Sequence, residues 1–179
     1  MRRTTLRLSL VGLIGLAVLL FSGTATAATD GTLGLTSTGT TDISIIKGET
    51  AMITGLTDII LAPWTTGDPA PIGTTNACVY TSTGNYQMTA TSSNGAGTAY
   101  RLTDGTNFIN YGVQWNDGAA GLQATSNGVA LVGQVGDGAS TTCGGATPAT
   151  VQVNITVGQM TAAPTGTFGD TLTVLIAPE

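Results

Sequence analysis

Residues 107–116 read NFINYGVQWN, and their pattern indicates the fold class. Apolar residues occupy every second position from residue 109 onward, and the positions between them hold glycine or an amide side chain. The apolar residues are Ile109, Tyr111, Val113 and Trp115. Successive side chains of a β-strand point to opposite faces, so this pattern predicts a strand with one buried face and one polar face.

The same alternation recurs elsewhere in the chain. Further runs cover residues 77–81, 86–90, 151–157 and 172–176. Sequences that favour tight turns separate the runs, among them Asn94-Gly95, Asp104-Gly105, Asp117-Gly118, Asn127-Gly128 and Asp137-Gly138. After residue 27, no apolar stripe with helical spacing extends beyond a turn or two. Short strands at this spacing predict an all-β sandwich or barrel.

The first 27 residues have the three regions of a secretory signal peptide. Arginines at positions 2, 3 and 7 precede an apolar run over residues 8–21, and Ala25-Thr26-Ala27 offers a cleavage site. The run has about 14 residues, fewer than the ~20 that a membrane-spanning helix needs. We therefore expect an exported chain that is cleaved after Ala27 and has no membrane span after cleavage.

Charged residues make up only 8% of the sequence. After residue 27, two basic residues, Lys47 and Arg101, remain against ten acidic ones, which gives a net charge of −8. Proteins that bind nucleic acid contact its phosphates with clustered lysine and arginine. We expect no nucleic-acid partner.

Cys78 and Cys143 are the two cysteines of the chain. An even number of cysteines in an exported protein predicts a disulfide bond. The alternative, a zinc site, requires about four ligands, and two isolated cysteines in a chain without histidine do not supply them. We expect Cys78 and Cys143 to form one disulfide.

The sequence is poor in catalytic groups. Without histidine it cannot form a Ser-His-Asp triad, and Lys47 is its one lysine. Its acidic residues are scattered, and several directly precede a glycine in a predicted turn. We expect no enzymatic activity, no metal and no cofactor. Trp64, in a loop after Ala62-Pro63, is a candidate exposed aromatic, whereas Trp115 lies on the apolar side of its strand.

The segment before the domain also alternates. We assign residues 40–46 as the first strand of a domain over residues 40–179, which leaves 28–39 as an N-terminal extension. Leu33 and Leu35 share one face of that extension. The extension either pairs within its own sheet or adds a strand to another chain.

Four segments, in their order along residues 31–179, resemble the spore coat protein U domain family. Members of that family are similar to the subunits of archaic chaperone-usher fimbriae. The segments are Cys78-Val79-Tyr80, residues 84–90 (GNYQMTA), residues 109–115 (INYGVQW) and residues 164–174 (PTGTFGDTLTV).

The resemblance implies an immunoglobulin-like sandwich that lacks its last strand and accepts the extension of the next subunit. Leu33 and Leu35 would then be the donor-strand knobs, and only two residues follow the strand that ends at Ala177. The implied partners are copies of the chain or related subunits, a periplasmic chaperone and an outer-membrane usher. The implied destination is a fibre or coat at the cell surface. The alternative is a self-contained secreted sandwich that binds a surface ligand such as a glycan.

Overall fold

The computed structural model describes residues 28–146 and 148–179. The predicted signal peptide, residues 1–27, lies outside the described residues. The chain divides after Ile46 into an N-terminal unit and a compact unit, Lys47–Glu179. Residues 28–46 are called the N-terminal segment below.

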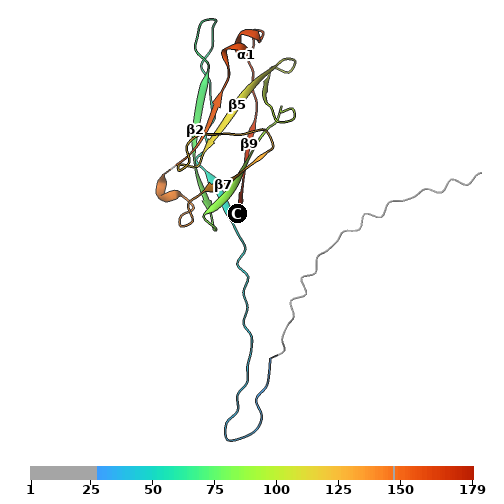
Figure 1. The fold of residues 1–179 in the computed structure, drawn as a ribbon, viewed down its shortest axis with the longest axis vertical. Helices are drawn as coiled ribbons and strands as arrows, with labels where there is room; N and C mark the ends of the chain where they lie inside the picture. Colours follow the sequence, from blue (N-terminus) through green and yellow to red (C-terminus); the bar gives the residue numbers. More distant parts are fainter. Residues whose placement is uncertain (1–27, 147) are drawn as a thin grey trace, which may run out of the picture. The chain divides into compact units, whose positions relative to one another are not determined.

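The compact unit is built from antiparallel strands in two layers (Figure 1). The strands are β1 (Ala51–Thr54), β2 (Ile72–Thr81), β3 (Asn85–Ser92), β4 (Tyr100–Thr103), β5 (Phe108–Asn116), β6 (Gln123–Ala124), β7 (Ala130–Val135), β8 (Ala149–Asn154) and β9 (Leu172–Pro178). Two short helices complete the unit, the 3₁₀-helix η1 (Cys143–Gly145) and the α-helix α1 (Val157–Ala162).

One sheet has the strand order β1-β2-β8-β5-β4, with β6 also paired to β5, and the other has the order β7-β3-β9. Their facing sides enclose one hydrophobic core. The chain is therefore an all-β sandwich, as predicted.

The core follows the alternation of residues 107–116. Every apolar residue of that pattern is buried, and Trp115 is fully buried. The Trp115 indole packs edge-to-face on Tyr86 of the other sheet, and its Nε1 donates a hydrogen bond of 3.1 Å to the Tyr86 hydroxyl. A buried tryptophan N–H needs such an acceptor, so this bond helps to fix the spacing of the two sheets.

Two predicted strands differ from the structure. Residues 40–46 lie in no described strand, and the first strand is β1, which starts at Ala51. The run at 151–157 ends as a strand at Asn154, and Val157 begins α1 instead. Thr156 caps this helix, because its hydroxyl accepts a hydrogen bond from the Gln159 N–H. The side-chain period alone did not reveal this cap.

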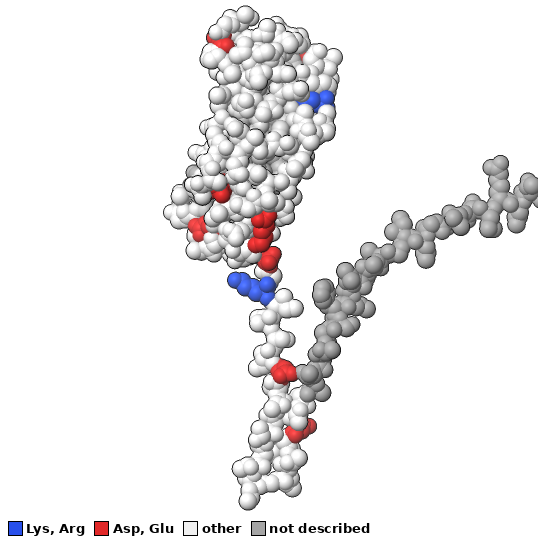
Figure 2. Space-filling model, viewed as in Figure 1, with Lys and Arg blue, Asp and Glu red and all other residues white. Residues whose placement is uncertain are grey.

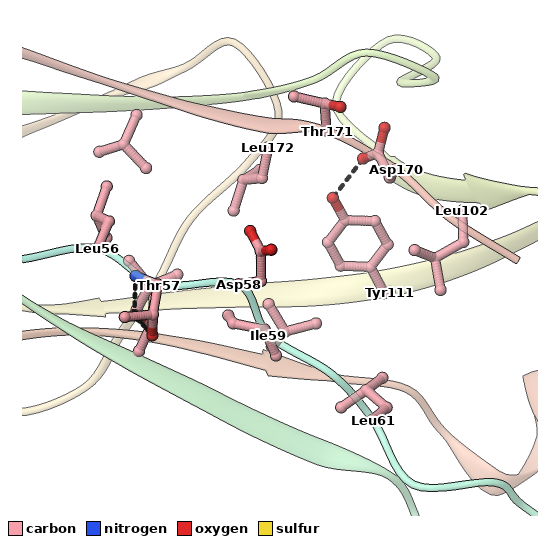
Figure 3. A pocket seen from close by; sticks show the side chains of 14 residues that line it. Leu56, Thr57, Asp58, Ile59, Leu61, Leu102, Tyr111, Asp170, Thr171 and Leu172 are labelled. Carbon is pink, nitrogen blue, oxygen red and sulfur yellow. Dashed lines mark hydrogen bonds between the residues drawn. The ribbon is translucent and has the colours of Figure 1, made fainter.

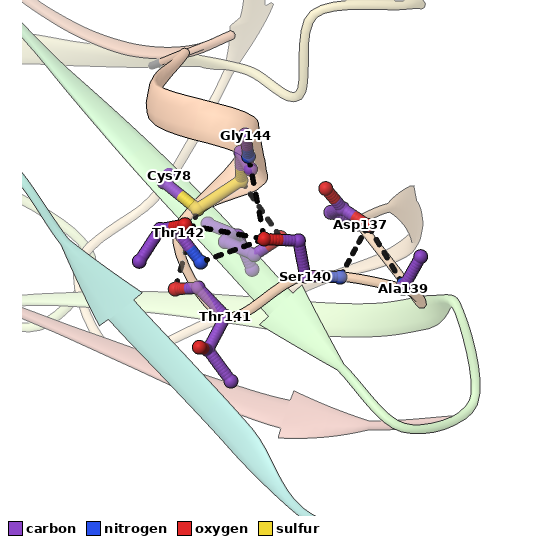
Figure 4. The surroundings of a disulfide bond; sticks show 9 residues. Cys78, Asp137, Ala139, Ser140, Thr141, Thr142 and Gly144 are labelled. Carbon is purple, nitrogen blue, oxygen red and sulfur yellow. Dashed lines mark hydrogen bonds between the residues drawn. A yellow bond between two sulfur atoms is a disulfide. The ribbon is translucent and has the colours of Figure 1, made fainter.

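Cys78 and Cys143 form a disulfide with their Cα atoms 5.8 Å apart, which confirms the predicted pair. Figure 4 shows the bond joining β2 to the segment that follows β7. Backbone hydrogen bonds reinforce this link, because Asp137 N–H donates to Val79 O and Thr81 N–H donates to Asp137 O. The segment over residues 136–146 is therefore tied to β2 covalently and by hydrogen bonds.

Within the described residues, no helix has both the length and the apolar character that crossing a bilayer requires.

Candidate functional site

The last strand of the sandwich has one unused edge. β9 pairs along its whole length with β3, from Leu172 opposite Ser92 to Pro178 opposite Tyr86. No described strand pairs with the other edge of β9. A strand edge presents a row of backbone N–H and C=O groups that can pair with a further strand.

A groove runs beside this edge and encloses a cavity of about 340 Å³ (Figure 3). One wall is residues 170–174, and the facing wall is the segment over residues 56–61, which follows β1. The floor is the inner face of the first sheet, where Thr75, Val151 and Val153 line the cavity. The groove therefore lies between the two sheets, directly over the core.

The apolar side chains along the groove are incompletely covered. Leu172, Val174 and Ile176 of β9 pack against the core but remain half-buried. On β3, the adjacent strand of the same sheet, Tyr86 and Met88 are no more than 1% exposed. The core is therefore closed under β3 and open along β9.

A hydrogen-bonded carboxylate lies at one end of the groove, just before β9. One oxygen of Asp170 accepts a 2.6 Å hydrogen bond from the Tyr111 hydroxyl, and the other accepts bonds from Ser93 Oγ at 2.7 Å and Asn94 Nδ2 at 2.9 Å. Burial raises the pKa of Asp170, but hydrogen bonds from neighbouring hydroxyl and N–H groups outweigh it, so its pKa lies below the ordinary value. Asp170 is therefore charged at neutral pH.

The same contact acts on Tyr111. Burial first, and then the hydrogen bond to Asp170, raise the pKa of the Tyr111 hydroxyl above its ordinary value. The hydroxyl is thus a proton donor at neutral pH. This pair holds the end of β9 against β5 and marks the end of the groove.

A second carboxylate, Asp58, lies on the facing wall. It is exposed and lines the groove between apolar residues of the 56–61 segment (Figure 3). This wall is held in place by Thr57, whose N–H donates a 2.9 Å hydrogen bond to Thr75 Oγ1. It also depends on Gly73, because a Cβ atom at that position would collide with the side chains of Ile59 and Leu61.

The predicted donor-strand knobs lie in a loop of the N-terminal segment. Thr29 and Thr40 form a backbone bridge with two hydrogen bonds of 3.0 Å. Leu33 and Leu35 lie in the loop that this bridge closes, where the chain bends over residues 33–36, and both are fully exposed. Their role as knobs stays a prediction.

Two further apolar residues follow the bridge. Ile43 and Ile45 are 92% and 93% exposed, on one parity of a segment that Figure 1 draws as an extended trace. The alternation over residues 40–46 predicts that they lie in the first strand of the domain, which the structure does not bear out. The same alternation of side chains occurs in strands that are paired in a sheet and in extended segments that are not. The sequence pattern therefore could not show whether this segment is paired.

The other candidates are placed as follows. Trp64 is half-buried, and its Nε1 donates to Pro69 O at 3.1 Å and to Asp68 O at 3.3 Å, so its polar atom is used within its own loop. The described residues contain no group of three or more side chains suited to a metal ion. Asp58, Tyr111 and Asp170 were not predicted as site residues. The available signal was an acid just before the last strand.

Comparisons with known proteins give little more. No protein-family model matches the chain, and no curated protein matches it. A search of solved structures finds a chain from a structure described as a chaperone–tip adhesin complex vital for activation of CFA/I fimbriae biogenesis. The two chains are 16% identical with a TM-score of 0.47, over 72% of this chain and 42% of that one. The resemblance to spore coat protein U domains stays a prediction.

Proposed function

We propose that this protein is a structural subunit of an extracellular fibre or surface coat, and that its groove binds a β-strand from another copy or a related subunit. The proposal rests on the structure of β9. One edge of this strand pairs with no described strand, and its core-facing apolar side chains are only half-buried. An added strand would pair with that edge and cover those side chains. Function would then come from assembly rather than from turnover.

Two further observations support this proposal. A disulfide is typical of proteins that fold in an oxidising compartment outside the cytoplasm. A free strand edge beside exposed apolar surface also promotes uncontrolled pairing with other chains. A periplasmic chaperone that lends a strand during transit, and an outer-membrane usher that exchanges it, are therefore the partners we propose.

The test compares two neighbouring residues of β9. Val174 faces the groove, whereas Leu175 points away from the core and is 61% exposed. We expect the mature chain, residues 28–179, to form assemblies that grow with concentration in sedimentation velocity. Val174→Asp should yield monomers, because a carboxylate inside an apolar interface is costly. Leu175→Asp should assemble like the unmodified chain.

Thermal melts of both variants, with the disulfide intact, establish that they are folded. A mature chain that stays monomeric throughout the concentration series would contradict the proposal. So would a folded Val174→Asp variant that assembles as well as Leu175→Asp.

A further inference from the structure

We infer that the strand that fills the groove is residues 41–47 of a second copy, with Ile43 and Ile45 over the core and Lys47 at the acidic end. This inference rests on the proposed function and names the occupant of the same groove.

Side-chain parity fixes how the segment fits. In an antiparallel pair, residues directly opposite each other point to the same face. Asp170, Leu172 and Val174 line the groove, and Ile176, two residues further along β9, packs against the core on the same face. A register that places Ile45 opposite Leu172 also places Ile43 opposite Val174. The same register brings Lys47 opposite Asp170.

Charge favours this register over a shifted one. The groove end carries the carboxylate of Asp170, whereas the exposed Asp58 lies further along the other wall (Figure 3). Basic side chains are scarce in the described part of the chain, as Figure 2 shows for one face, and consist of Lys47 and Arg101. The Arg101 guanidinium stacks 4.2 Å from the Phe108 ring centroid, and its Nε donates a 2.7 Å bond to Asn94 O. Lys47 is exposed and remains to match the carboxylate of Asp170.

The segment around Leu33 and Leu35 fits the groove less well. Those leucines flank Gly34, and glycine weakens a strand because of its backbone entropy. They also lie where the chain bends. The same spacing would bring Ser37 to the acidic end, and serine carries no charge. Isoleucine, in contrast, is a strong strand former.

Chain reach requires a second copy for this register. Thr50 O accepts a hydrogen bond from Ser82 N–H, and Glu179 N–H donates to Asn85 O, so β1 begins at the end of the sandwich where β9 finishes. Asp170 lies about 30 Å away, at ~3.3 Å for each residue of an extended strand. Lys47 lies three positions before Thr50, and three extended steps span about 11 Å at most. The subunit's own Lys47 therefore cannot reach its own Asp170.

The experiment uses two matched pairs of substitutions in the mature chain. Ile43→Asp with Ile45→Asp and Leu33→Asp with Leu35→Asp each add two carboxylates with the same spacing, at exposed positions outside the compact unit. Sedimentation velocity should show the isoleucine variant as a monomer at concentrations where the unmodified chain assembles. The leucine variant should assemble like the unmodified chain.

The possible results distinguish a failure of this inference from a failure of the proposed function. Loss of assembly in the leucine variant alone would overturn the inference, and the proposed function would stand. An unmodified chain that never assembles would overturn both. Assembly that survives both variants would also overturn the inference, because the groove would then have another occupant.

A charge reversal tests the placement of Lys47. Lys47→Glu should weaken assembly by about tenfold, because it places a second carboxylate opposite Asp170 at the groove end. Lys47→Arg, which keeps the positive charge, should assemble like the unmodified chain. A Lys47→Glu variant that assembles as well as Lys47→Arg would overturn the assigned register.

Discussion

The strands β3 and β9 lie side by side in one sheet, yet they bury their core-facing residues to different degrees. Tyr86 and Met88 of β3 are almost inaccessible, whereas Leu172 and Val174 of β9 are half-buried. β3 has a paired neighbour on both edges, and β9 has one on a single edge. The amino-acid composition of β9 therefore does not explain why the core is open there. The core is open where one edge of β9 has no described partner strand.

Removal of the disulfide bond should cause the largest loss of stability. Replacing Cys78 and Cys143 by alanine removes a crosslink between residues 65 apart in sequence. We expect the free energy of unfolding to fall by about 4 kcal/mol, because the unfolded chain gains freedom. Urea denaturation measures this change. A loss of less than about 1 kcal/mol would show that hydrogen bonds alone hold residues 136–146 to β2.

A matched pair of core truncations tests the difference in burial directly. Met88→Ala should cost about 3 kcal/mol, within the range for buried large side chains. Leu172→Ala should cost about 1 kcal/mol in the unassembled subunit, because its side chain is already partly hydrated. Urea midpoints in the Ile43→Asp, Ile45→Asp background measure both. Equal costs would mean that the two sides of the core are packed alike.

The smallest expected effect is on the loss of folding stability at acidic pH. The pKa of Asp170 is lowered in the folded chain, so its charge stabilises the fold above about pH 4, the unfolded value, and this contribution is lost as the pH falls through the folded pKa. Asp170→Asn should therefore reduce the fall in the urea midpoint between about pH 5 and pH 3. Asp30→Asn, in the exposed N-terminal segment, is the control and should leave that fall unchanged.

Much of the sandwich follows from the sequence. The alternation around Tyr111 and Trp115 places both side chains in the core, and the two cysteines pair as expected. The turn sequences separate strands that the structure confirms. These features depend on local periodicity and on a small number of residue types, which a single sequence displays.

The groove could not be predicted from the sequence in the same way. Leu172 and Val174 alternate like any core-facing residues, and only the sheet order reveals that no described strand pairs with the other edge of β9. Ile43 and Ile45 form an equally good strand pattern without a described partner. The approach of Asp58 and Asp170 to one groove depends on contacts over more than a hundred residues of sequence, and no local pattern reports them.

The most direct test of strand addition is a crosslink between two kinds of subunit. Ile45→Cys chains are mixed with Leu172→Cys chains and oxidised, and the products are separated by non-reducing electrophoresis. The register places these residues opposite each other, close enough for a disulfide. Leu35→Cys serves as the alternative donor and Leu175→Cys as the misdirected acceptor. We predict a covalent heterodimer of the 45 and 172 variants that forms faster than any pairing with residue 35 or 175. No crosslink between position 172 and any N-terminal cysteine would contradict an open groove filled by a second copy.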